Sequence, residues 1–252
     1  MTITRDTFHC PHCGHSISGQ EPSTRELFSY IEQLESFALM PTIWRKMLRE
    51  GSDFLNQHRL FAVLVARMDH YINLLDQCTA DTLVKEKAEM YAELLNRVLE
   101  AIIPIIDQRG GSILELQPES ILAAWGIPLS EDDFTKAVST ALEIQERLLS
   151  FQEEHADDRD FALKIGIAGG FMYVGTIGTS NHRSFAIIGS SAIKAARLSV
   201  IAEPGQTLVD QSIYKWTEDV IVYEQPTTKS EFAESGIQPQ HYVALKERIA
   251  SV

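Results

Sequence analysis

Two cysteines near the start of the chain have the residue types and spacing that hold a metal ion. Cys10 and Cys13 form a Cys-x-x-Cys motif, and His9, His12 and His15 lie beside them. Two thiolates at this spacing reach one tetrahedral Zn²⁺ while amides of the intervening turn bond to the sulfurs. Zinc needs four ligands, and the chain has no second motif of this kind. The sequence therefore predicts a zinc site completed by histidines or by the same pair from a second subunit.

Residues 1–19 form this possible zinc-knuckle segment, with Cys10, Cys13, His9 and His15 as the expected ligands. Two alternatives stay open, a polar leader with free thiols and a redox-active pair. A redox motif of the thioredoxin type opens a helix after a strand, and we expect no strand before Cys10. Cys78 stands alone in the sequence and is expected to be a packed helix residue.

The rest of the composition is that of a globular protein with an acidic surface. The 252 residues include 35 Asp plus Glu against 22 Lys plus Arg, a formal net charge of −13. Such a surface repels phosphate backbones, so we expect no nucleic-acid partner. No apolar run approaches the roughly 18 residues that span a bilayer, so we expect no membrane insertion. The N-terminus lacks an apolar signal core and cysteines are few, which favours a cytoplasmic protein.

The elements that must position any site begin with a helical extension over residues 20–58. A capping box at Ser23–Glu26 precedes apolar residues at helical spacing over 27–38, and Pro41 suits the first turn of a second helix. The main domain is expected over residues 59–252. There, FAVLVARM (61–68) is a continuous apolar run typical of a strand covered on both faces.

The remaining elements alternate between helix and strand periods. The pattern predicts helices over 81–109, 131–155 and 191–202, with Pro104 kinking the first and Gly110-Gly111 ending it. It predicts strands at SILEL and SILAAW (joined by the turn 117–119), 161–170, 172–178, 185–189, 206–210, 219–225 and 241–247. Glycines separate the segments 161–170 and 172–178. The β-α-β-β-α-β order predicts a ferredoxin-like core with additional αβ elements, an α/β (α+β) sandwich.

Five of these segments resemble, in the same order, parts of the class III adenylyl/guanylyl cyclase catalytic domain. They are FAVLVARM, LLNRVLEAIIPIIDQRGG, ILAAWGIP, KIGIAGG and IIGSSAIKAARL. The last resembles the family's IG-xx-VN-xAARL segment, and KIGIAGG resembles the strand that opens its dimerisation arm. The resemblance implies the class III cyclase fold for the main domain and a homodimer formed through the cyclase-type interface.

In this family, two aspartates hold two divalent cations, one on the first strand and one at the tip of the central hairpin. The matching positions here are Arg67 and Glu119. A cation at the first position opposes metal binding, so no Mg²⁺ or Mn²⁺ is expected there. Asp69 lies on the same face of an extended strand as Arg67 and is a possible replacement ligand. We also expect Arg67 to form an ion pair with Glu119 or Asp69, because a partly buried charge is tolerated when paired.

The other positions that the resemblance assigns to chemistry are also altered. The base-selecting lysine matches Glu115, and its partner selector matches Ala186. The ribose-orienting asparagine matches Ile193, and the transition-state arginine is retained as Arg197. We expect Arg197 to form a structural ion pair. The segment 227–241 departs from the family pattern, and no residue in it is matched to the triphosphate-binding lysine.

In this family, each active site takes its metal carboxylates from one chain and its base and ribose contacts from the other. This chain is altered at both sets of positions. The resemblance therefore implies a catalytically inactive, dimerising regulatory or interaction module with an unidentified protein partner. One alternative is a metal-independent nucleotide or small-ligand sensor in which Arg67 and Arg197 bind an anion. The other is an active nucleotidyl cyclase with displaced metal ligands, Asp69 and Glu119.

Overall fold

A computed structural model gives the structure of the chain. It describes residues 8–9, 16–17, 56–68, 81–126, 130, 132–154, 161–179, 183–225 and 241–247. The helices expected within the extension 20–58 lie outside these residues, as do Asp69, Cys78, and Cys10 through His15.

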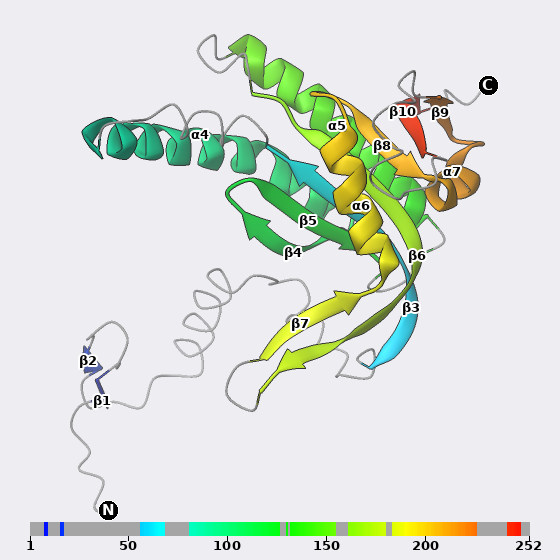
Figure 1. Cartoon of the computed structure of the whole chain (residues 1–252), viewed down its shortest axis with the longest axis horizontal. Coiled ribbons are helices and arrows are strands. Elements are labelled where there is room, and N and C mark those ends of the chain that lie inside the picture. The colour runs from blue at the N-terminus through cyan, green and yellow to red at the C-terminus, as the bar shows by residue number, and fades with distance from the viewer. Residues whose placement is uncertain are drawn as a thin grey trace, which may run out of the picture.

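One mixed sheet forms the centre of the main domain (Figure 1). Its strands are β3 (Gln57–Arg67), β4 (Ser112–Gln117), β5 (Ser120–Trp125), β6 (Lys164–Gly178), β7 (Arg183–Ile188), β8 (Thr207–Asp210), β9 (Ile221–Glu224) and β10 (His241–Glu247). The strand order is β4-β5-β3-β6-β8-β10-β9, with β7 paired to β6 outside this path. All strand pairs are antiparallel except β6 with β8.

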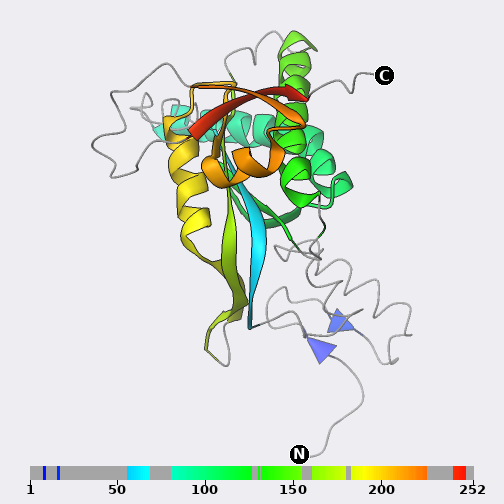
Figure 2. The same cartoon turned by 90° about the vertical axis from the view of Figure 1, so that its right-hand side faces the viewer.

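Helices cover both faces of the sheet. They are α4 (Asp81–Gln108), α5 (Asp133–Glu154), α6 (Ser190–Ile201) and α7 (Gln211–Thr217). Figure 2 shows α6 on one side of the sheet and α5 on the other. The chain order β3-α4-β4-β5-α5-β6 is the predicted β-α-β-β-α-β core, so the α/β sandwich is confirmed. No helix in the described residues is both long and apolar enough to cross a bilayer.

The central strand β3 is buried on both faces, as its apolar run predicts. Ala62, Leu64 and Ala66 join the larger core with residues of α4 and α5. Phe61, Val63 and Val65, on the other face, join a smaller core that includes Ala195 of α6. Alternate side chains of a strand point to opposite faces. Since Arg67 continues the second set, it lies on the α6 face.

The helix α4 ends where its glycines predict. The helix stops at Gln108, and Gly110 follows with a φ of +76°, a conformation that favours glycine. A Cβ on Gly111 would lie 2.7 Å from both Ile106 and Trp125. The chain therefore turns tightly enough to seat the buried Trp125 against the end of α4.

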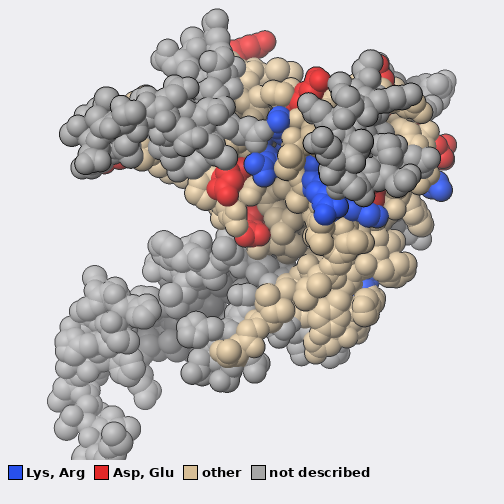
Figure 3. Space-filling view, viewed as in Figure 1, with Lys and Arg blue, Asp and Glu red and all other residues tan. Residues whose placement is uncertain are grey.

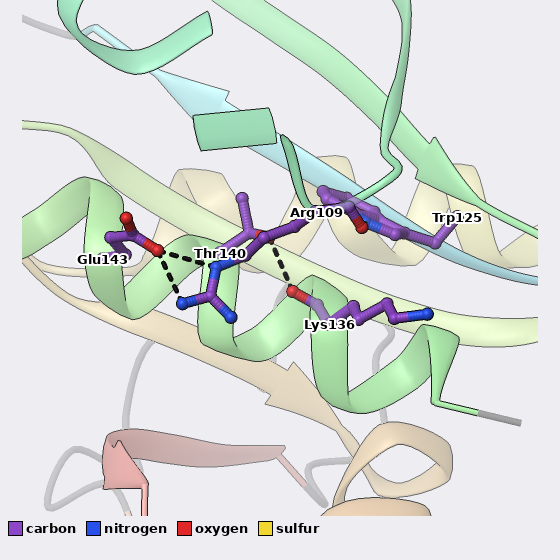
Figure 4. A network of polar contacts seen from close by, with 5 residues as sticks. All are labelled: Arg109, Trp125, Lys136, Thr140 and Glu143. Carbon is purple, nitrogen blue, oxygen red and sulfur yellow. Dashed lines mark hydrogen bonds and ion pairs between the residues drawn. The ribbon is translucent and has the colours of Figure 1, made fainter. Parts of the chain in front are cut away.

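A polar network joins this helix end to β5 and α5 (Figure 4). The indole of Trp125 donates to the carbonyl of Arg109 over 3.0 Å. The Arg109 guanidinium forms an ion pair with Glu143 of α5 at 2.6 Å. On the same helix, the Thr140 hydroxyl donates to the carbonyl of Lys136. These contacts fix the helices that support the central hairpin β4-β5.

Three sequence expectations differ from the structure. The segments 161–170 and 172–178 are one unbroken strand, β6, because its glycines allow close approach by neighbouring elements instead of ending the strand. A Cβ on Gly166 would lie 2.2 Å from the Ala195 carbonyl of α6. The seven-residue helix α7 was not expected. It begins directly after β8, with no glycine or proline between them.

The third difference lies beside the cysteines. A two-residue strand, β1 (Phe8–His9), precedes Cys10, so the expectation that no strand precedes the motif is wrong. It pairs antiparallel with β2 (Ser16–Ile17), with Phe8 opposite Ile17 and His9 opposite Ser16. Residues 10–15 thus connect the two strands of a short hairpin.

Candidate functional site

The structure brings Arg67 and Glu119 to the same end of the sheet. Arg67 is the last residue of β3 and Glu119 lies in the turn between β4 and β5; both are half-buried. The amide of Met68 donates to the carbonyl of Glu119 over 2.8 Å. The two positions are therefore adjacent along the backbone ladder. The ion pair of Arg67 with Glu119 or Asp69 stays a prediction.

Glu115 lies on the same sheet face as Arg67. In the register of the hairpin, Arg67 is opposite Ser120 of β5, and Glu115 of β4 is opposite Leu122. Val65 is also opposite Leu122, so these side chains share the α6 face. Glu115 is exposed and accepts a hydrogen bond from the side chain of Gln117. Its carboxylate therefore occupies the surface where the resemblance places a base-selecting lysine.

Lys164, which no sequence motif indicated, lies beside Arg67 in the sheet. It begins β6 and is the direct antiparallel partner of Arg67. Its ammonium lies 3.5 Å from the carbonyl of Val200 in α6. Directly opposed residues point to the same face. The pairing register of β3 with β6 is the signal that would have revealed this second cation.

The remaining three positions form a separate group on β7 and α6. Ala186 is half-buried on β7, opposite Gly175 of β6. Ile193 is 57% exposed on α6, and Arg197 is exposed four residues later, on the same helix face. Among the described residues, Arg197 takes part in no ion pair. The expected ion pair of Arg197 stays a prediction.

The donor groups at the end of β3 do not fit a pair of divalent cations. Mg²⁺ and Mn²⁺ take oxygen ligands, mainly carboxylates. In the described part of the chain this end offers the Glu119 carboxylate, next to the cations Arg67 and Lys164. No three His, Cys, Asp or Glu side chains of the described residues are grouped to share an ion. No reaction step through a metal is derived for this site.

Comparison with known proteins agrees with this architecture. The family model for the adenylate and guanylate cyclase catalytic domain matches residues 58–241, more than half of the chain. The chain belongs to this family. The cyclase-type fold and the family were thus correctly identified from the sequence motifs.

Individual cyclases show how far the similarity extends. Human adenylate cyclase type 10 is 30% identical over 114 residues, 44% of this chain. The match spans only 7% of the length of that relative. The adenylyl cyclase CyaB from P. aeruginosa has a TM-score of 0.63 at 21% identity, covering 76% of this chain and 96% of that one. A non-canonical dimeric guanylyl cyclase domain from the fungus Blastocladiella emersonii has a TM-score of 0.61 at 17% identity, covering 75% of this chain and 98% of that one.

A buried carboxylate, Asp210, anchors the cyclase fold between α6 and α7. Its side chain caps α7 by accepting from the amide of Ile213 over 3.0 Å, and it also accepts from the amide of Gly169 over 3.3 Å. Lys194 of α6 lies 4.0 Å away. Burial raises the pKa of Asp210, and these amides and Lys194 offset part of that effect. The residue organises the side of α6 near the altered site.

Proposed function

We propose that this chain is a non-catalytic cyclase-homology domain that acts as a dimerising regulatory module. The observation that carries this proposal is the position of Arg67 at the end of the first strand, opposite Lys164 and next to Met68, whose amide donates to the Glu119 carbonyl. Cyclisation of a nucleoside triphosphate produces a transition state dense in negative charge, which divalent cations stabilise. A site that repels those cations lacks that stabilisation.

The size of this repulsion supports the proposal. Two unit charges about 4 Å apart at an effective dielectric of about 20 interact by roughly 4 kcal/mol, and a dication doubles that figure. Each 1.4 kcal/mol is about tenfold in affinity, so even the smaller figure costs about a thousandfold. The altered positions on β7 and α6 do not compensate for this loss of metal affinity, because Ile193 and Ala186 have no polar side-chain atoms with which to hold a nucleotide.

The arm formed by β7 and the far half of β6 offers a surface on which a second copy of this chain could pack. The far half of β6 and β7 project from the body (Figure 1) and carry exposed apolar side chains. Phe171 is 74% exposed, and Ile177 and Ile188 are each 52% exposed. Ile188 is opposite Tyr173, so alternation along β6 places Phe171, Tyr173, Ile177 and Ile188 on one face of the arm.

The test of inactivity is product formation from ATP and from GTP with excess Mn²⁺, beside an active class III cyclase as positive control. We expect no product from the purified full-length chain above the level of a heat-denatured sample. Turnover that is abolished by Glu119→Ala would overturn the proposal. Turnover that survives this substitution would instead indicate a contaminating enzyme, which repurification of the chain removes.

A second candidate function is a metal-independent sensor of an anionic ligand. Figure 3 shows Lys and Arg side chains over α6 and the neighbouring end of the sheet. Lys194 and Arg197 are exposed on α6, and Arg67 and Lys164 lie on the same sheet face. Calorimetric titration with ATP in EDTA discriminates the two functions. Saturable binding that is lost in Arg197→Ala favours the sensor, and its absence favours the purely regulatory module.

A further inference from the structure

A cavity of about 280 Å³ lies at the opposite edge of the sheet from the altered cyclase site. It is formed at α7, β9 and the start of β10. Figure 1 shows these elements at one side of the molecule, with β4 and β5 on the other. In the strand order, β4 and β9 are the two edges of the sheet. The cavity is therefore separate from Arg67, Glu119 and Glu115, and it is independent of the proposed function.

Three tyrosines of the cavity lining contact one another through their rings. Tyr214 and Tyr242 are stacked, with centroids 3.7 Å apart and planes at 12°. Tyr223 meets Tyr214 edge to face at 5.2 Å and Tyr242 at 6.3 Å. The Tyr223 hydroxyl shares a hydrogen bond with the Thr217 hydroxyl of α7. The three rings thus form a packed aromatic wall among the residues that line the cavity.

The rest of the lining is acidic or neutral. It comprises Glu218, Asp219 and Glu224, together with Gln225, and contains no lysine, arginine or histidine. All four are exposed. None of the three carboxylates takes part in an ion pair within the described residues. Three carboxylates around an aromatic wall produce a local negative potential, which the net charge of −13 reinforces.

Burial raises the pKa of Tyr223 to about 12, with its hydrogen bond to Thr217 acting in the opposite direction. The phenol therefore stays neutral at physiological pH and adds no negative charge to the cavity. Its ring contributes a quadrupole whose negative face attracts cations.

We propose that this cavity binds a guanidinium group. A guanidinium is planar and cationic, so it can stack on a tyrosine ring while its N–H groups donate to a carboxylate in a bidentate manner. The lining supplies both partners within one cavity. An ammonium ion fits less well, because it is more strongly hydrated and lacks the planar fork. The two sources of this chemistry are an arginine side chain of a polypeptide and a free guanidino compound.

The experiment uses the full chain labelled with 3-fluorotyrosine and observed by ¹⁹F NMR. The seven tyrosines are assigned by single Tyr→Phe substitutions. The ligand probe is N-acetyl-arginine amide, and its uncharged isostere N-acetyl-citrulline amide is the matched control. We expect saturable shifts of the Tyr214, Tyr223 and Tyr242 resonances with the arginine compound only. Absence of shifts, or equal shifts with citrulline, would overturn the proposal.

Carboxylate variants test the charge contribution without disturbing the tyrosines. Glu224→Gln and Asp219→Asn change exposed side chains, and we expect each to weaken binding by up to roughly fivefold, as for exposed ion pairs. Glu203→Gln changes an exposed carboxylate outside the cavity and should leave binding unchanged. If all three variants weakened binding equally, the cause would be the net charge of the chain, and this result would contradict a defined site.

A final comparison identifies the source. A blocked peptide with one arginine and the free compound agmatine carry the same guanidinium. Tighter binding of the peptide assigns a polypeptide partner, and tighter binding of agmatine assigns a small metabolite. Failure of both overturns the proposal and leaves the proposed function intact, because no residue of the cyclase site lines the cavity.

Discussion

Arg67 is the residue on which the proposed loss of metal binding depends. Its place at the end of β3 is set by the register with Ser120 and Lys164, so its guanidinium cannot move to another sheet face without unpairing the strand. Its effect on a metal ion is electrostatic and local. A change of one side chain therefore tests the metal argument without changing the fold.

Arg67→Asp is expected to raise the affinity for Mn²⁺ by at least about tenfold, because it replaces a repulsive charge with a ligand oxygen. No turnover should follow, since Glu115, Ala186 and Ile193 remain. Calorimetric titration with Mn²⁺ measures the change. Arg59→Asp, on the same strand and sheet face, gives the same change in net charge and should leave the affinity unaltered. If the affinity for Mn²⁺ rose equally in both variants, the effect would come from net charge, which would contradict a local repulsion by Arg67.

Asp210→Asn is expected to become relatively more stable than the native chain as pH rises. Burial raises the folded pKa of Asp210 above its ordinary 3.8, so the folded state holds this proton more tightly than the unfolded state. The resulting gain in the free energy of unfolding of the native chain is present below pH 3.8 and is lost as pH rises through the folded pKa. Asparagine keeps an oxygen for the Ile213 and Gly169 amides but does not titrate.

Urea unfolding of both chains between pH 3 and 7 measures this difference in the free energy of unfolding. Asp210→Ala does not titrate either and also removes the cap of α7, so it should be less stable than Asp210→Asn by about 1 kcal/mol at every pH. Asp132→Asn, at an exposed aspartate, is the control and should show no such trend. A constant difference between Asp210→Asn and the native chain would contradict the shifted pKa.

At the scale of elements, α6 lies so close to β6 that only glycine fits at their crossing. A Cβ on Gly166 would lie 2.2 Å from the Ala195 carbonyl and 2.4 Å from the Ser199 amide. Both atoms belong to the backbone of α6 and cannot rotate away. The position of Ile193 and Arg197 therefore depends on this contact.

Gly166→Ala should reduce the free energy of unfolding by about 3 kcal/mol, because the helix must move to admit one methyl group. Gly170→Ala is the matched control on the same strand. There the new Cβ would meet the Ser191 hydroxyl at 2.6 Å, a side-chain atom that can change rotamer. For Gly170→Ala we expect the free energy of unfolding, measured in denaturant, to fall by less than about 1 kcal/mol. Equal losses would contradict the tight crossing of α6.

The hairpin of β1 and β2 flanks the cysteine motif, and the predicted zinc site can be tested there. The strands of this hairpin pair Phe8 with Ile17 and His9 with Ser16, on either side of the segment that contains Cys10 and Cys13. We propose one zinc ion per chain, measured by inductively coupled plasma mass spectrometry after dialysis. Cys10→Ser with Cys13→Ser should remove it, whereas Cys78→Ser should not. Equal metal content in all three proteins would contradict a cysteine-bound zinc site.

Much of this architecture could be predicted because apolar periodicity determines element type. The buried run 61–66 identified β3, and Gly110-Gly111 marked the end of α4. Strand continuity across Gly169 and Gly170 could not be predicted, since it depends on close approach by Phe134 and Ser191 from other elements. The tyrosine cavity was also hidden, because its three rings meet only through the order β8-β10-β9.

The site was predictable in part for the same reason. Motif order predicts that Arg67 and Glu119 lie near each other, and the sheet brings them to one end. Lys164 was missed because its relation to Arg67 exists only in the pairing of β3 with β6. A residue's role in a family motif can be read along the chain, whereas its neighbours across a sheet require the register.

At the scale of the whole molecule, the exposed arm determines how two copies would meet. Phe171→Glu with Ile188→Glu should convert a dimer to a monomer in sedimentation velocity. Burying each side chain contributes about 1.5–3 kcal/mol, so the double variant should weaken the dimer by at least roughly a hundredfold. Leu149→Glu, 61% exposed on α5 outside the arm, is the control. A native chain that is monomeric at all concentrations would contradict the arm interface.

The unbroken course of β6 links that interface to the thermal behaviour of the domain. Its pairing with β3 runs from Arg67 opposite Lys164 to Gln57 opposite Val174, without interruption between body and arm. Where β6 is paired with β3, the arm and the body therefore share one sheet, so binding at this part of the arm also stabilises the folded body. A partner that binds only the folded state raises the melting temperature by mass action. We thus expect a melting temperature that increases with protein concentration.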